Sequence, residues 1–130
     1  MNCVFCNIIK GNIPAYSIYE DEIVKVILDV QPNTNGHMLI IPKEHVVDIN
    51  DIKIEVLTHI NMVIKKMHPL LEQALAINGM TIVQNNGSAQ EVKHFHMHLI
   101  PRYHDDGLTP KYSSDNLLPL DVVYTKLTKK

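Results

Sequence analysis

The sequence has few of the features of a secreted, membrane-bound or disulfide-stabilised protein. It contains only two cysteines in 130 residues, and no apolar run reaches the roughly 20 residues that span a bilayer. Its first residues lack the basic and then apolar segments of a signal peptide. We therefore expect a cytoplasmic protein with no membrane partner, which folds around a hydrophobic core without disulfide bonds.

A strong charge of one sign is also absent. Lys and Arg number 12 against 14 Asp and Glu, the net charge is −2, and like charges do not form long blocks. We therefore expect no nucleic-acid partner, because such binding depends on clustered positive charge. The length and a hydrophobic content of 45% indicate a single domain over residues 1–130, with a polar arm from about residue 103.

Proline and glycine divide the chain into short segments. We expect a short helix at residues 5–10 and strands at residues 17–20, 23–28, 37–41, 80–84 and 94–100. Apolar residues recur every three or four positions from Leu57 to Leu75, which predicts one long helix that begins near Lys53. Pro69 should kink or break this helix near residues 65–68, and Pro119 is typical of the start of a short C-terminal helix. The predicted fold class is α+β, an antiparallel sheet with the long helix and the short helices on one face.

Three of the eight histidines occupy alternate positions in the segment 94–100. A strand would place His94, His96 and His98 on one face and the apolar residues between them on the other. Three imidazoles on one face repel one another when protonated. The pattern therefore indicates a site for a metal ion or an anionic group.

Two chemistries suit such a face, and the residues alone leave both open. In the first, the imidazoles hold Zn²⁺ and a metal-bound water is the nucleophile. This chemistry needs a nearby base, and the closest acidic residues in sequence, Glu91, Asp105 and Asp106, lie outside the predicted strand. In the second, one imidazole attacks phosphorus and its neighbours donate hydrogen bonds to the phosphoryl oxygens. The small-residue loop at 87–91 favours the second chemistry, because free backbone N–H groups can bind an anion.

Three separated motifs resemble those of the histidine triad (HIT) family. They are His94-x-His96-x-His98-Leu-Ile-Pro-Arg, the earlier Gly36-His37-Met-Leu-Ile-Ile-Pro-Lys43, and the N-terminal Cys3-x-x-Cys6-x-Ile-Ile-x-Gly11. The resemblance covers about residues 2–102 and is strongest to the bacterial branch close to the nucleotide phosphoramidases. It implies a single HIT domain with a variable C-terminal arm, and a homodimer in which the sheet continues from one subunit into its partner.

The resemblance also implies an activity and a set of site residues. The activity is hydrolysis or transfer at the α-phosphate of a purine nucleotide, through a nucleotidyl-histidine intermediate and without a catalytic cofactor. His96 matches the nucleophile, His98 the histidine that contacts the phosphate, and His37 a fourth, supporting histidine. The residues that match the substrate site are Asn85 and Gln90 at the phosphate, Asp29 and Val30 at the ribose and base, and Phe5, Ile8 and Ile27 around the base.

In some members a Cys-x-x-Cys pair, a downstream histidine and the first triad histidine bind a structural zinc ion. These ligands match Cys3, Cys6, His45 and His94, a set that suits tetrahedral zinc.

The sequence departs from the family at the loop Ala89-Gln90-Glu91, where the usual form is Gly-Gln followed by Ser or Thr. The loop is shorter than the common form, and Glu91 would repel a substrate phosphate. The altered loop therefore leaves open a purine-nucleotide-binding partner protein with little turnover. The histidine face leaves open a second alternative, a zinc-dependent phosphohydrolase.

Overall fold

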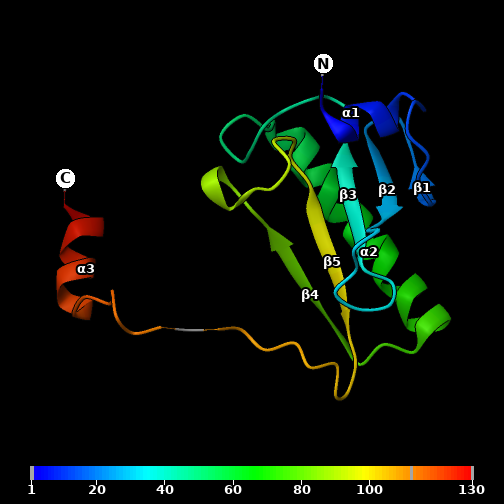
Figure 1. The fold of residues 1–130 in the computed structure, drawn as a ribbon. Helices are drawn as coiled ribbons and strands as arrows, with labels where there is room; N and C mark the ends of the chain where they lie inside the picture. Colours follow the sequence, from blue (N-terminus) through cyan, green and yellow to red (C-terminus); the bar gives the residue numbers. More distant parts are fainter. Residues whose placement is uncertain (1, 112, 130) are drawn as a thin grey trace.

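The computed structural model describes residues 2–111 and 113–129. Within these residues five strands form one antiparallel sheet in the order β1-β2-β3-β5-β4 (Figure 1). The elements are α1 (Val4–Ile9), β1 (Ser17–Glu20), β2 (Val24–Leu28), β3 (Met38–Pro42), α2 (Ile54–Leu75), β4 (Gly79–Gln84), the 3-10 turn η1 (Gly87–Ala89), β5 (Met97–Arg102) and α3 (Leu120–Thr128). The predicted α+β class with an antiparallel sheet is confirmed.

The two faces of the sheet pack against different helices. On one face, Val26 and Ile40 pack in a buried cluster with the apolar side of α2, which includes Ile60 and Met67. Residues that alternate with these along β2 and β3 point to the other face and pack against Phe5 and Ile8 of α1. The long helix therefore lies where we expected it, whereas the expectation that α1 shares its face is wrong.

Helix α2 runs from Ile54 to Leu75 with Pro69 inside it, so the expected break does not occur. Pro69 removes the N–H that would bind the carbonyl of Lys65. Both residues are exposed, on the side of the helix away from the buried cluster. Water can therefore satisfy the freed carbonyl, and packing of the opposite side keeps the helix continuous.

Strand β5 begins three residues later than predicted, at Met97, and continues through Pro101 to Arg102. The segment that carries His94 and His96 therefore precedes the strand instead of forming its first half. This segment is held in place by Phe95, whose side chain is fully buried and whose N–H donates to the carbonyl of Val46 at 2.8 Å.

The chain beyond β5 leaves the sheet as an arm. The Arg102 guanidinium binds the Asp106 carboxylate at 2.8 and 3.1 Å, which fixes the first residues of the arm. The arm then leads to α3, which has no buried residue among those described and stands apart from the sheet in Figure 1. The predicted C-terminal helix is confirmed, but it covers neither face of the sheet. In the described part of the chain, no helix combines the length and the apolar character that a membrane crossing requires.

Candidate active site and metal cluster

A pocket of about 610 Å³ opens across the sheet at the ends of β2 and β4. The histidines His37, His96 and His98 line it. Phe5, Ile8 and Ile27 form an apolar part of the lining, which also includes Asp29, Val30, Asn85, Ala89 and Glu91. The topology explains this meeting, because β3 and β5 lie between β2 and β4 in the sheet. The residues that follow β2 and those that follow β4 therefore lie on opposite sides of the histidines.

His96 has one defined ring tautomer. Its Nδ1 lies 2.7 Å from the carbonyl oxygen of His94, and a carbonyl only accepts hydrogen bonds, so Nδ1 carries the hydrogen. The ring is buried, and Phe5 packs edge-on against it at 4.9 Å between ring centroids. The other nitrogen, Nε2, therefore keeps its lone pair at the pocket.

His37 and His98 form a chain that fixes the opposite tautomer at His98. The backbone N–H of Asn33 donates to Nδ1 of His37 at 3.0 Å, so the hydrogen of His37 lies on Nε2. The Nε2–H of His37 donates to Nδ1 of His98 at 3.0 Å. A carboxylate oxygen of Asp29 lies 3.5 Å from Nε2 of His37. His98 therefore carries its hydrogen on Nε2. The pocket contains a lone pair at His96 and an N–H donor at His98.

Burial keeps this histidine pair neutral. It lowers the pKa of His98 to about 4, and the neighbouring His96 and His37 act in the same direction. Burial also lowers the pKa of His37, against the opposite effect of the Asp29 carboxylate. Both rings are therefore uncharged near pH 7, as the hydrogen-bond chain requires.

The structure does not bring every expected site residue to the pocket. Gln90, which the resemblance placed at the phosphate, is absent from the pocket lining and its side chain is only 6% exposed. Its Nε2 donates to the carbonyl of Val47 at 2.6 Å, and its Oε1 has no partner within the described residues. The neighbours Ala89 and Glu91 line the pocket instead.

Asn33 is a site residue that sequence reasoning missed. Its backbone N–H determines the tautomers of His37 and His98. The only signal was the turn composition of residues 31–36, which predicts a loop before His37 but not which N–H reaches the ring.

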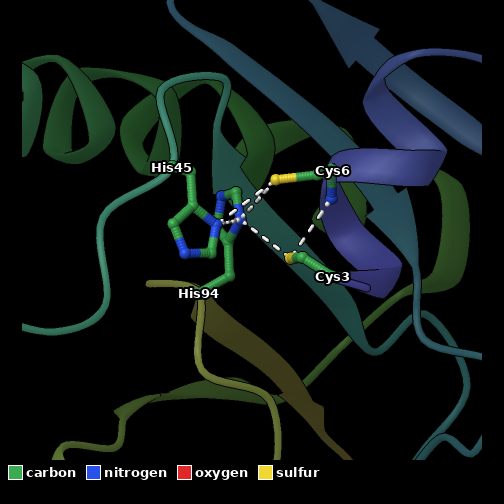
Figure 2. Close-up of side chains that lie close together, drawn as sticks. All are labelled: Cys3, Cys6, His45 and His94. Carbon is green, nitrogen blue, oxygen red and sulfur yellow. Dashed lines mark hydrogen bonds between the residues drawn. The ribbon is translucent and has the colours of Figure 1, made fainter. Parts of the chain in front are cut away.

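A second cluster of side chains contains Cys3, Cys6, His45 and His94. Figure 2 shows the four side chains converging from α1, the loop after β3 and the segment before β5. The Nδ1 atoms of His45 and His94 are 3.1 Å apart, and each lies 3.3 Å from a cysteine sulfur. All four ligand atoms lie within 4.8 Å of one another.

The donor set of this cluster fits a zinc ion. His94 Nε2 lies 2.8 Å from the carbonyl of Pro42 and carries the hydrogen, so its Nδ1 lone pair is free for a metal. Zinc bonds of about 2.0–2.3 Å to two nitrogens and two sulfurs in a tetrahedron place the donor atoms roughly 3.3–3.8 Å apart. Four of the six separations between donor atoms are 3.1–3.6 Å, close to these values.

Comparisons with known proteins identify the family of the chain. The model of the HIT domain family matches residues 10–105. An adenosine 5′-monophosphoramidase of Saccharomyces cerevisiae is 41% identical over 102 residues, which are 77% of this chain and 62% of the yeast protein.

Two solved structures are similar over most of both chains. A HIT family protein from Bacillus subtilis has a TM-score of 0.83 at 34% identity. The alignment covers 100% of this chain and 97% of the B. subtilis chain. A zinc-bound histidine triad family protein from Mycobacterium smegmatis has a TM-score of 0.80 at 40% identity. The alignment covers 88% of this chain and 85% of the mycobacterial chain. By sequence and by fold, the chain belongs to the HIT domain family.

Proposed function

We propose that this protein hydrolyses purine nucleoside 5′-phosphoramidates at the α-phosphate through a nucleotidyl-His96 intermediate. One observation carries the proposal: a single pocket contains a ring nitrogen with a free lone pair at His96 and an N–H donor at His98. A nucleophile and a donor for phosphoryl oxygens are the two groups that such a reaction needs. The phosphoramidase named among the relatives supports the choice of substrate.

In the first step, the Nε2 lone pair of His96 forms a bond to phosphorus. The bond from phosphorus to the leaving amine breaks, and its electron pair remains on the amine nitrogen, which takes up a proton from water. The new bond makes the His96 ring cationic, and the carbonyl of His94 stabilises that charge through Nδ1–H. His98 Nε2–H donates to a phosphoryl oxygen. In the second step, the oxygen of water forms a bond to phosphorus and the bond from phosphorus to Nε2 breaks. Its electron pair returns to His96, a proton of the water passes to solvent, and the nucleoside monophosphate leaves.

The nucleotide binds with its base against the apolar wall of Phe5, Ile8 and Ile27, beside the exposed Val30. The Asp29 carboxylate accepts hydrogen bonds from the ribose hydroxyl groups. Its orientation is fixed by a hydrogen bond from the backbone N–H of Gln31 at 2.9 Å. Asn85 binds on the phosphate side. Because Gln90 is turned inward, Asn85 and His98 supply the side-chain contacts to the phosphate.

The proposal includes three further features. Zinc binds Cys3, Cys6, His45 and His94 and has a structural role, which the donor geometry and the zinc-bound relative support. The protein is cytoplasmic, where cysteines remain reduced and able to bind metal. It is a homodimer whose sheet continues into the partner, and β4, an edge strand with Ile82 exposed, is a suitable place for pairing.

The direct test measures hydrolysis of adenosine 5′-phosphoramidate after metal removal, with circular dichroism to confirm folding. We expect turnover to persist, and His96→Ala to lower it by at least about a thousandfold because the nucleophile is lost. Nucleotide binding by His96→Ala, measured by calorimetry, should remain. His68→Ala is the matched control, because His68 lies on α2 and away from the pocket lining.

Wild-type turnover by His96→Ala would contradict the proposal. Loss of activity in the folded, metal-free protein, with recovery on addition of zinc, would favour a zinc-dependent phosphohydrolase. The only observation that favours this alternative is the grouping of Asp29, His37 and His98 within reach of one ion. Nucleotide binding with almost no turnover by the wild type would indicate a binding partner protein instead.

A further inference from the structure

The pocket has an unusual charge content for a site that accepts a phosphate. Its lining includes two carboxylates, Asp29 and Glu91, and no lysine or arginine among the residues described. Burial keeps His37 and His98 neutral. A nucleotide therefore enters a pocket whose fixed charges are negative.

Of the two pocket carboxylates, Glu91 is the one that has no partner in the described structure. Asp29 accepts a hydrogen bond from the N–H of Gln31 and lies near His37, whereas Glu91 forms no ion pair with any cation of residues 2–111 and 113–129. Lys93 is two residues away, but its ammonium group donates to the carbonyl of Gly87 at 2.6 Å.

The direction of the proposed reaction determines which part of the substrate Glu91 meets. An attacking nitrogen and a leaving group lie on opposite sides of phosphorus. His96 is buried, so the leaving group departs toward the exposed rim of the pocket. In the binding mode proposed above, the nucleoside lies on the α1 and β2 side of that rim. Ala89 and Glu91 form an exposed part of the rim on the loop that follows β4.

We propose that Glu91 is a specificity residue that selects leaving amines with a positive charge, such as a primary ammonium group on a short chain. This inference rests on the phosphoramidase function proposed above. A cationic leaving group pairs with the Glu91 carboxylate, while a neutral one leaves the carboxylate uncompensated beside the phosphate. An anionic leaving group, including the phosphate chain of a dinucleoside polyphosphate, is repelled.

The test uses three adenosine 5′-phosphoramidates whose leaving amines carry matched propyl chains that end in ammonium, methyl or carboxylate. For the wild type, kcat/KM should fall in that order, with about a fivefold preference for ammonium over methyl, the scale of one exposed ion pair. Glu91→Gln should remove this preference, and Glu91→Lys should reverse it. Added salt should weaken the wild-type preference, because exposed charges are screened.

Glu22→Gln is the control, since it makes the same charge change in the turn before β2, at the other end of that strand from Asp29. An ammonium-to-methyl ratio that Glu91→Gln leaves unchanged, or that Glu22→Gln changes equally, overturns the role of Glu91 but not the phosphoramidase function. If the wild type hydrolyses none of the three compounds, both proposals are overturned.

Discussion

At the scale of single residues, Gly36 determines how the loop before His37 meets the core. Its φ is +91°, and a Cβ at this position would lie 2.6 Å from Leu75 Cδ1 and 3.2 Å from Pro101 Cγ. A side chain here is therefore opposed both by the backbone conformation and by the end of α2. The loop reaches His37 along this path only because residue 36 has no Cβ.

We expect Gly36→Ala to lower the free energy of unfolding by about 2 kcal/mol or more, because it adds a steric clash to the backbone cost. Urea unfolding measures this change. The control is Gly107→Ala, where φ is +73° but a Cβ would have no neighbour within 4 Å among the described residues. That variant should lose only about 1 kcal/mol. Equal losses in the two variants would show that the contact with Leu75 has no energetic role.

The sequence predicted the histidines of the site better than their surroundings. His37, His96 and His98 meet as expected, because short motifs identify them. Gln90 turns inward to Val47, and Asn33 reaches His37, through contacts that depend on how the chain folds around the site. Spacing along one segment carries no information about such contacts.

At the scale of elements, α1 depends on the rest of the molecule for its stability. A helix of six residues does not form alone in water. Phe5 and Ile8 attach it to the sheet, and Cys3 and Cys6 attach it to His45 and His94. The same helix provides part of the apolar wall of the pocket, so the two sites share one element.

We expect Zn²⁺ to raise the melting temperature of the metal-stripped wild type by about 10 °C or more, since ligand at a thousandfold excess over Kd contributes about 4 kcal/mol. Hydrogen exchange should slow in residues 4–10 at the same time. Cys6→Ser should lose both effects because one ligand is changed, and Mg²⁺ is the control ion. A zinc effect of full size in Cys6→Ser would mean that the ion binds elsewhere.

Most element types followed from sequence, but the continuity of α2 and the start of β5 did not. The break expected at Pro69 is absent because one side of α2 is exposed at that point while the other is packed. Strand β5 starts after the histidine segment because Phe95 pairs with the Val46 carbonyl instead of a strand neighbour. In both cases tertiary packing overrides a local rule.

At the scale of the whole molecule, buried neutral histidines make stability depend on pH. Burial, with the neighbouring His96 and His37, lowers the pKa of His98 from 6.5 to about 4 in the folded state. Between these values the unfolded chain binds more protons than the folded one. Stability is therefore complete above about pH 6.5 and is lost as the pH falls toward 4.

We expect the free energy of unfolding to rise between about pH 4.5 and 6, with His98 contributing up to about 1.4 kcal/mol per pH unit. Urea unfolding at several pH values should give a shallower slope for His98→Gln. His68→Gln, at a half-exposed position on α2, should keep the wild-type slope. Identical slopes for wild type and His98→Gln would contradict the assignment.

The three consecutive side chains of the segment His94-Phe95-His96 lie in three different parts of the molecule. His94 belongs to the cysteine–histidine cluster, Phe95 to the core and His96 to the pocket. An insertion or deletion here would rotate every side chain into the wrong environment, so evolution can change this segment only by substitution in place. The end of the arm, where α3 has no buried residue among those described, is free to vary in length, and new specificities should arise at the pocket rim.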